Sequence, residues 1–185
     1  MIRNIVWKGL NPDSMEFCRI HFRDTILVKS TIVGCSEDIP YKADYEMELS
    51  LDWVINCVQI KSWLGNSEQS LTLKHNGHGK WHGNDREWKH LEGCMDIDIS
   101  LTPFTNSIPV NRLRVLPNAS ADTELIYIDV LRFGVTRQRQ SYTNLGAHQY
   151  HFRAEDGHFE AKITMDELNL VSDYPGLFNR LLVRD

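Results

Sequence analysis

The sequence predicts a mainly β fold, in which about a dozen antiparallel strands form one curled or closed sheet with few short helices. Apolar and polar side chains alternate with a period of two along almost every segment of the 185-residue chain. This is the pattern of strands that bury one face and expose the other. Turn-forming residues separate these segments, and a sheet with so many strands usually curls or closes because that removes exposed edges.

The expected strands follow one another along the whole chain. They comprise residues 4–8, 16–23, 25–33, 45–57, 58–63, 71–75, 80–82, 95–102, 113–116, 124–133, 137–142, 149–153 and 159–165. Turn signals rich in Gly, Asn, Asp and Pro lie at residues 11–14, 64–66, 76–77, 82–85, 117–119 and 155–157. The best helix candidate is the short segment 175–182, because Pro175 can occupy the first position of a helix.

Two of these segments alternate without interruption. Every second position of residues 45–57 is apolar, namely Tyr45, Met47, Leu49, Leu51, Trp53, Ile55 and Cys57. The second segment sets Phe159, Ala161, Ile163 and Met165 against His158, Glu160, Lys162, Thr164 and Asp166. We expect each segment to be one continuous strand with its apolar face in the core.

Length and composition indicate one globular domain spanning residues 1–185. No segment is rich enough in Pro, Gly or Ser to be a linker, and no repeat of constant period occurs. Apolar residues make up 42% of the chain and charged residues 24%, which excludes a disordered or fibrous protein. The formal net charge of −5 argues against nucleic acid or an anionic membrane surface as a partner, because both attract basic proteins.

The sequence favours a cytoplasmic location. Residues 1–8 lack the apolar core and small-residue cleavage site of a signal peptide. No apolar run approaches the roughly 18 residues of a membrane span. Cys18, Cys35, Cys57 and Cys94 are dispersed without paired spacing, which is typical of reduced thiols.

The most informative segment is the strand expected at residues 95–102. One face carries Met95, Ile97, Ile99 and Leu101, and the other carries Asp96, Asp98, Ser100 and Thr102. Pro103 and Pro109 cannot donate hydrogen bonds to a neighbouring strand, so an irregular segment should follow and end at Arg112. We expect that segment to form a shaped edge or a lid.

Short motifs spread over nearly the whole chain resemble those of one bacterial family. They are Gly79-Lys80-Trp81, Leu91-Glu92-Gly93-Cys94-Met95-Asp96-Ile97-Asp98, Thr102-Pro103-Phe104-Thr105-Asn106, Pro109 with Arg112-Leu113, Gln140-Ser141-Tyr142 and Asp173-Tyr174-Pro175-Gly176-Leu177-Phe178. The family is named "Putative glycolipid-binding" and is a former domain of unknown function. The resemblance implies a spiral β-roll or barrel-like antiparallel sheet, and a binding function inferred from likeness to lipoprotein-carrier barrels.

Asp96 and Asp98 are the first candidates for a functional site. Because they lie two residues apart on one strand face, they are ~6–7 Å apart. This separation suits a metal ion, a pair of sugar hydroxyls or acid–base catalysis, and the alternative is a solvated strand face. Arg112 is expected to pair with one of these carboxylates, to bind an anionic group of a ligand, or to be an ordinary surface arginine.

Further polar candidates come from the segment 102–112 and from the strand at 137–142. If the acidic face turns inward, the segment closes over both carboxylates. Gln138, Gln140 and Tyr142 share one strand face, which suits a sugar-binding wall as well as an exposed edge strand. The polar residues that we include in the candidate site are Thr102, Thr105, Asn106, Gln140 and Tyr142.

Aromatic residues supply candidates of a second kind. Trp53 continues an apolar row and is expected in the interior, whereas Trp81 and Trp88 flank a turn and are better placed to contact a ligand. The alternative for Trp81 is an ordinary core position. Tyr174, Leu177 and Phe178 are expected to plug one end of the barrel.

These observations leave three functions open, of which a binding role is preferred over an enzymatic one. The first is a carrier or binding protein whose barrel holds an amphipathic, glycolipid-like ligand. Its hydrocarbon part would lie near Met47, Leu49, Trp53, Phe159 and Ile163, and its polar head near Asp96, Asp98, Thr105, Asn106 and Arg112.

The second function is a metal-assisted hydrolase of a phosphorylated or glycosylated small molecule. Asp96 and Asp98 would hold a magnesium-like ion together with Asp129 or Asp173. The third is an interaction module whose barrel is filled by its own side chains. No phosphate-binding loop, dinucleotide-binding motif or nucleophile motif occurs, and we expect no cofactor.

Overall fold

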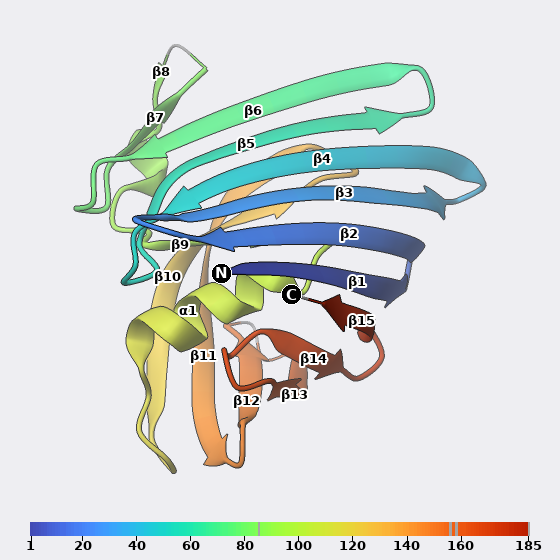
Figure 1. The fold of residues 1–185 in the computed structure, drawn as a ribbon. Helices are drawn as coiled ribbons and strands as arrows, with labels where there is room; N and C mark the ends of the chain where they lie inside the picture. Colours follow the sequence, from blue (N-terminus) through green and yellow to red (C-terminus); the bar gives the residue numbers. More distant parts are fainter. Residues whose placement is uncertain (85, 156, 158, 185) are drawn as a thin grey trace.

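The structure is a computed structural model that describes residues 1–84, 86–155, 157 and 159–184. Asp85, Asp156 and His158, which belong to predicted turns and a predicted strand face, lie outside the described residues. The prediction of a mainly β fold is confirmed, because fifteen strands form one sheet in the described part of the chain (Figure 1). The strands are β1 (Ile2–Leu10), β2 (Asp13–Phe22), β3 (Ile26–Ser36), β4 (Ile39–Leu49), β5 (Ile55–Leu64), β6 (Ser67–His75), β7 (Trp81–Gly83), β8 (Arg86–Glu87), β9 (Asp96–Ile99), β10 (Ser120–Asp129), β11 (Gly134–Gly146), β12 (Gln149–Ala154), β13 (Glu160–Met165), β14 (Val171–Tyr174) and β15 (Phe178–Arg184). Their order in the sheet is β8-β7-β6-β5-β4-β3-β2-β1-β15-β14-β13-β12-β11-β10-β9, antiparallel throughout except for the parallel pair β9–β10.

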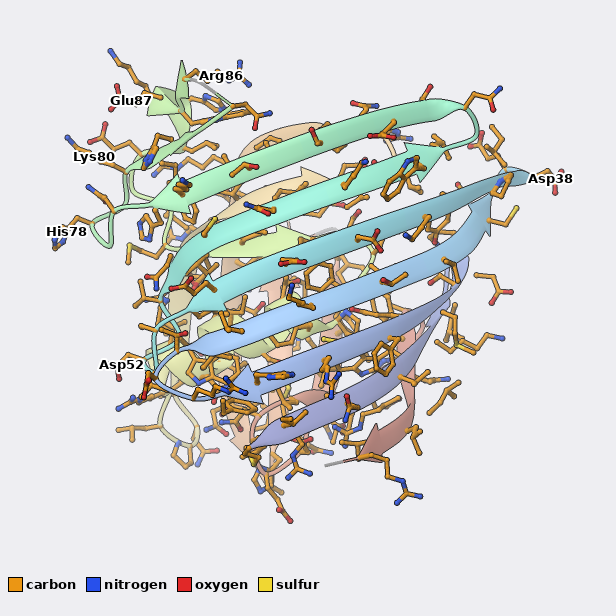
Figure 2. The ribbon with its side chains drawn as sticks, turned by 45° about the horizontal axis from the view of Figure 1, so that its top comes forward. Asp38, Asp52, His78, Lys80, Arg86 and Glu87 are labelled. Carbon is orange, nitrogen blue, oxygen red and sulfur yellow. The ribbon has the colours of Figure 1, made fainter. Side chains whose placement is uncertain are left out.

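The sheet curls so that its two halves face each other across the core. Strands β1 to β6 form a broad curved layer, and β10 and β11 run across behind it (Figure 1). Trp7 and Tyr45 from the first half belong to the same apolar cluster as Ile97 and Ile126 from the second. Within β4, Glu46 and Glu48 are exposed on the outer face between buried neighbours, and charged side chains such as Asp52 project from the turns at the ends of the layer (Figure 2). Burial on one face and solvent on the other explains the period of two in the sequence.

The sheet is open, so the closed β-barrel considered from the sequence is wrong. Its edges are β8, which has only two residues, and β9. The free edge of β9 is covered by the 3-10 helix η2 (Phe104–Asn106) and the α-helix α1 (Ser107–Leu113). The N–H group of Ile99 donates to Oγ1 of Thr105 at 3.2 Å. A side chain thus accepts a hydrogen bond from this edge strand, which a neighbouring strand would accept in a closed barrel. The segment 102–112 is therefore the shaped edge that the sequence predicts.

Residues 45–57 do not form one strand, because a turn at residues 50–54 separates β4 from β5. The N–H group of Val54 donates to Oγ of Ser50 at 3.2 Å, and Trp53 has left-handed backbone with φ of 63°. Leu51 lies in this turn and is 58% exposed. The apolar alternation continues through the turn residues and thereby conceals the turn.

The helix expected at 175–182 and the strand expected at 113–116 are also wrong. Pro175 and Gly176 form the turn between β14 and β15, with a φ of 79° at Gly176, as a Pro-Gly turn requires. Helix α1 ends at Leu113, and it tolerates Pro109 because N–H groups in a first helical turn have no helical partner. A second 3-10 helix, η1, spans Lys89–Leu91. Within the described residues, no helix combines the length and apolar character needed to cross a membrane.

The first and last strands pair with each other, and this pairing joins the two halves into one sheet. Strand β1 lies antiparallel to β15, with Ile5 opposite Val183 and Val6 opposite Leu182. Beyond the end of this pair, the N–H group of Leu10 donates to the carbonyl of Leu177 at 2.8 Å. The junction therefore sets the turn after β1 beside the turn before β15.

We predict that proline in β15 weakens this junction. Hydrogen-bonded and non-hydrogen-bonded pairs alternate along antiparallel strands, so only one of Leu182→Pro and Val183→Pro removes a hydrogen bond to β1. That variant should lose about 1–3 kcal/mol more of the free energy of unfolding than the other, measured by urea denaturation. Leu182→Ala and Val183→Ala control for the lost side chains. Two proline variants as stable as their alanine controls would contradict the importance of the junction.

Candidate functional site

A pocket of about 670 Å³ opens between β9–β11 and the C-terminal strands. Turn residues from the N-terminal half also line it, among them Asn11, Pro12 and Glu37. The pocket therefore exists only because the β1–β15 junction brings both halves of the sheet to the same place.

The two sides of the pocket differ in chemistry. One side, formed by β9 to β11 and the segment after β9, carries the polar groups of Asp98, Asn106, Tyr127, Gln138 and Gln140, beside the apolar Ile99 and Leu101. The other side is aromatic and apolar and carries Phe152, Phe159, Tyr174, Leu177 and Phe178. The rings of this second side pack on one another, with centroids 6.0–6.3 Å apart in the pairs that Phe152 and Phe159 form with each other and with Tyr174. The C-terminal residues expected to plug a barrel end thus form a wall of the pocket.

Asp98 is the centre of a hydrogen-bond network on the polar side. Thr105 Oγ1 donates to its Oδ1 at 3.0 Å, and Gln140 Nε2 donates to its Oδ2 at 2.7 Å. Tyr142 donates to Gln140 Oε1 at 3.1 Å and accepts from Asn106 Nδ2 at 3.0 Å. Burial raises the pKa of Asp98, and the hydrogen bonds from Gln140 and Thr105 oppose that rise. The network fixes the orientation of both Asp98 and Gln140 toward the pocket.

Asp96 has different partners from Asp98, although the two lie on the same strand. Arg112 donates from Nε to Asp96 Oδ1 at 2.8 Å and from Nη2 to Oδ2 at 2.6 Å, and Thr123 also donates to Oδ2. The Asp96 side chain is fully buried and the Arg112 side chain is 17% exposed. This two-point ion pair ties the end of α1 to β9 and β10, and it is one of the roles expected for Arg112 from the sequence.

No observation favours the metal-assisted hydrolase. Both oxygens of Asp96 already accept hydrogen bonds from protein groups, and Asp129 accepts from the backbone N–H groups of Leu131 and Arg132. Within residues 1–84, 86–155, 157 and 159–184, no group of three or more His, Cys, Asp or Glu side chains is arranged to hold a metal ion.

The structure brings most of the sequence-predicted residues together. The candidates that line the pocket are Asp98, Thr102, Asn106 and Gln140. Thr105 and Tyr142 lie behind them and hold them by hydrogen bonds. Asp96 and Arg112 form the adjoining ion pair rather than part of the pocket lining.

Trp81 is not brought to this pocket. It is 1% exposed, its ring stacks on His75 with centroids 4.3 Å apart, and its indole N–H group donates to the carbonyl of Cys94 at 2.8 Å. The core alternative considered for Trp81 is therefore the one the structure supports. Of the residues expected around a hydrocarbon chain, only Phe159 lines the pocket, whereas the others are core residues, namely Met47, Leu49, Trp53 and Ile163.

Sequence reasoning missed Glu16, which is 2% exposed and lies beside the pocket residue Thr102. Glu16 Oε1 accepts hydrogen bonds from Ser30 at 2.7 Å, Tyr45 at 2.8 Å and Thr102 at 2.9 Å. Its Oε2 is buried and has no hydrogen-bond partner among the described residues. Burial outweighs the three hydrogen bonds and raises the pKa of Glu16 to about 7.

The alternation within β2 contains a signal for this buried carboxyl group. Cys18 and Ile20 point into the core, so a period of two requires Glu16 to point the same way. Met15 and Phe17 then point outward and are 44% and 50% exposed. Along this strand, the apolar and polar residues exchange faces between residues 17 and 18.

We predict that Arg112→Met strongly destabilises the protein, because it leaves the buried carboxylate of Asp96 without a cation. The free energy of unfolding should fall by about 3–5 kcal/mol. Arg139→Met is the matched control, since Arg139 pairs with Asp122 where both side chains are about half exposed. The control should cost less than about 1 kcal/mol. Urea denaturation of both variants measures the difference, and similar losses would refute the structural role of the Asp96–Arg112 pair.

A second prediction concerns pH. Because the pKa of Glu16 is raised to about 7 from an ordinary 4.5, folding favours its protonated form. Its contribution to stability is full below pH 4.5 and is lost as pH rises toward and through 7, by about 3 kcal/mol at most. Glu16→Gln should remove this loss, so the variant gains stability relative to the unmodified protein between pH 4.5 and 8. Urea denaturation of both proteins across this pH range measures the difference in their free energies of unfolding. Glu46→Gln, at an exposed position, is the control. A pH-independent stability difference would show that the carboxyl group titrates normally.

Comparisons with known proteins agree with this architecture. A family model described as "Putative glycolipid-binding" matches residues 4–180. No curated protein matches the chain. Among solved structures, a DUF1089 family protein from Pseudomonas aeruginosa is 32% identical and superposes with a TM-score of 0.84, over 91% of this chain and 92% of that one. The chain therefore belongs to the family named "Putative glycolipid-binding".

Proposed function

We propose that this protein binds an amphipathic, glycolipid-like molecule in the pocket and serves as its binding or carrier protein. The observation that carries the proposal is the division of the pocket into a polar side around Asp98 and Gln140 and an aromatic side around Phe152 and Phe159. A volume of about 670 Å³ lies within the range of small-molecule sites. The name of the family supports the same conclusion.

Each side of the pocket matches one part of such a ligand. Carboxylate and amide groups exchange hydrogen bonds with sugar hydroxyls, and aromatic rings pack against the apolar face of a sugar or against an alkyl chain. A wholly apolar ligand would remove water from these polar groups without replacing the hydrogen bonds that they make to it, which is costly. A wholly polar ligand would leave the aromatic side in contact with water.

We further propose that the protein acts in the cytoplasm on a small molecule and not on nucleic acid. The free thiols of Cys18, Cys35, Cys57 and Cys94 support a reducing compartment. The formal net charge of −5 supports a partner other than nucleic acid.

We predict that n-octyl β-glucoside, titrated below its micellar concentration in a calorimeter, binds more tightly than glucose. Phe159→Ala should weaken octyl glucoside binding about tenfold, because it removes apolar contact from the pocket. Phe159 is 39% exposed, so the fold should tolerate this change.

Phe17→Ala is the matched control, since Phe17 is 50% exposed and does not line the pocket. It should leave binding unchanged. The proposal fails if the folded protein binds neither octyl glucoside nor longer alkyl glycosides, or if both alanine variants weaken binding equally.

A further inference from the structure

The pocket holds a carboxylate whose hydrogen-bond partners, in the part of the chain that the structure describes, are all uncharged. Asp96 is neutralised by the guanidinium of Arg112, whereas Asp98, two residues further along β9, accepts hydrogen bonds from Thr105 and Gln140. These two bonds use one acceptor position on each oxygen of Asp98, and a carboxylate offers about four. Asp98 therefore retains acceptor capacity, and it lines the pocket where Asp96 does not.

Among the described residues that line the pocket, negative charge is in excess. The charged groups are three carboxylates, from Glu37, Asp98 and Asp129, and one guanidinium, from Arg132. A concave site with this balance attracts cations and repels anions, and the partly desolvated surroundings strengthen both effects. An anionic head such as a phosphate or a carboxylate would meet this repulsion, and among the described lining residues no buried cation offsets it.

We propose that the polar head of the ligand carries a protonated amine, as an amino sugar does, and that this ammonium group pairs with Asp98. The inference rests on the proposed function and specifies its ligand class. An ammonium group supplies the positive charge that Asp98 lacks and donates up to three hydrogen bonds. It does for Asp98 what Arg112 does for Asp96, while the aromatic side of the pocket covers the apolar part of the same molecule.

The hydrogen-bond network behind Asp98 suits this role. Thr105 and Gln140 hold both carboxylate oxygens in place before any ligand arrives, and Tyr142 and Asn106 hold Gln140 in turn. A preorganised acceptor loses little conformational freedom on binding. The upward shift in the pKa of Asp98 by burial agrees with a carboxylate that lacks a cation, and a bound ammonium would reverse it.

The test compares three probes that differ only in the head: n-octyl β-glucosaminide, n-octyl β-glucoside and n-octyl β-glucuronide, titrated at pH 7 by calorimetry. We expect the amine to bind about thirtyfold more tightly than the neutral glucoside, and the anionic glucuronide to bind most weakly. Asp98→Asn should abolish the preference for the amine, because it should weaken glucosaminide binding far more than it weakens glucoside binding. Glu37→Gln removes one carboxylate from an exposed position of the same pocket and should retain most of the preference.

The outcomes separate the two proposals. If the glucoside binds as tightly as the glucosaminide, or the glucuronide binds most tightly, the inference about the amine is wrong while ligand binding in the pocket stands. If Asp98→Asn keeps the preference for the amine, another group holds the ammonium and the assignment to Asp98 is wrong. If none of the three probes binds, the proposed function itself is contradicted. Should Asp98→Asn fail to fold, the comparison of the three probes on the unmodified protein still decides whether the pocket prefers an amine.

Discussion

The antiparallel pairing of β1 with β15 is the interaction on which the rest of the structure depends. Without it the described strands would form two separate sheets, one from β1 to β8 and one from β9 to β15. Each would present an additional unpaired edge to water. With it, the sheet is continuous and curls over a shared core, and the pocket receives residues from both halves. The pairing of β1 with β15 thus brings the lining residues together, although no residue of β1 itself lines the pocket.

Polar groups inside this apolar fold are concentrated around β9. Asp96, Asp98 and Glu16 are held by separate sets of partners, and each set connects β9 or the loop after it to a different part of the sheet. Buried carboxylates are costly unless they are hydrogen-bonded or paired, so these sets position the segment 102–112 more than they add stability. The irregular segment between Pro103 and Arg112 therefore has a defined shape despite its lack of strand partners.

The sequence predicted the strands well because a period of two is a direct consequence of a sheet with one buried face. It failed where that period continues through a turn, as at Leu51, and where a Pro-Gly turn resembles a helix start, as at Pro175. It also left open whether the sheet is curled or closed, since alternation within strands carries no information about which strands form the edges. For the site, Asp98 and Gln140 were predicted from polar residues on alternating faces. For Trp81 the sequence left a core position and a ligand contact open, because a tryptophan beside a turn can be buried or exposed; the structure has it buried.

Strand β2 shows what happens when alternation and hydrophobicity disagree. Glu16 faces the core and Phe17 faces water, while Cys18 and Ile20 keep the buried phase. A slip of one residue against its neighbours would bury Met15 and Phe17 and release Glu16, but it would expel Cys18 and Ile20. The composition of β2 alone therefore favours the observed register only slightly over the register shifted by one residue. Pairing with β1 and β3 must therefore determine its register. During folding, we expect β2 to take its register from these neighbouring strands and not to set theirs.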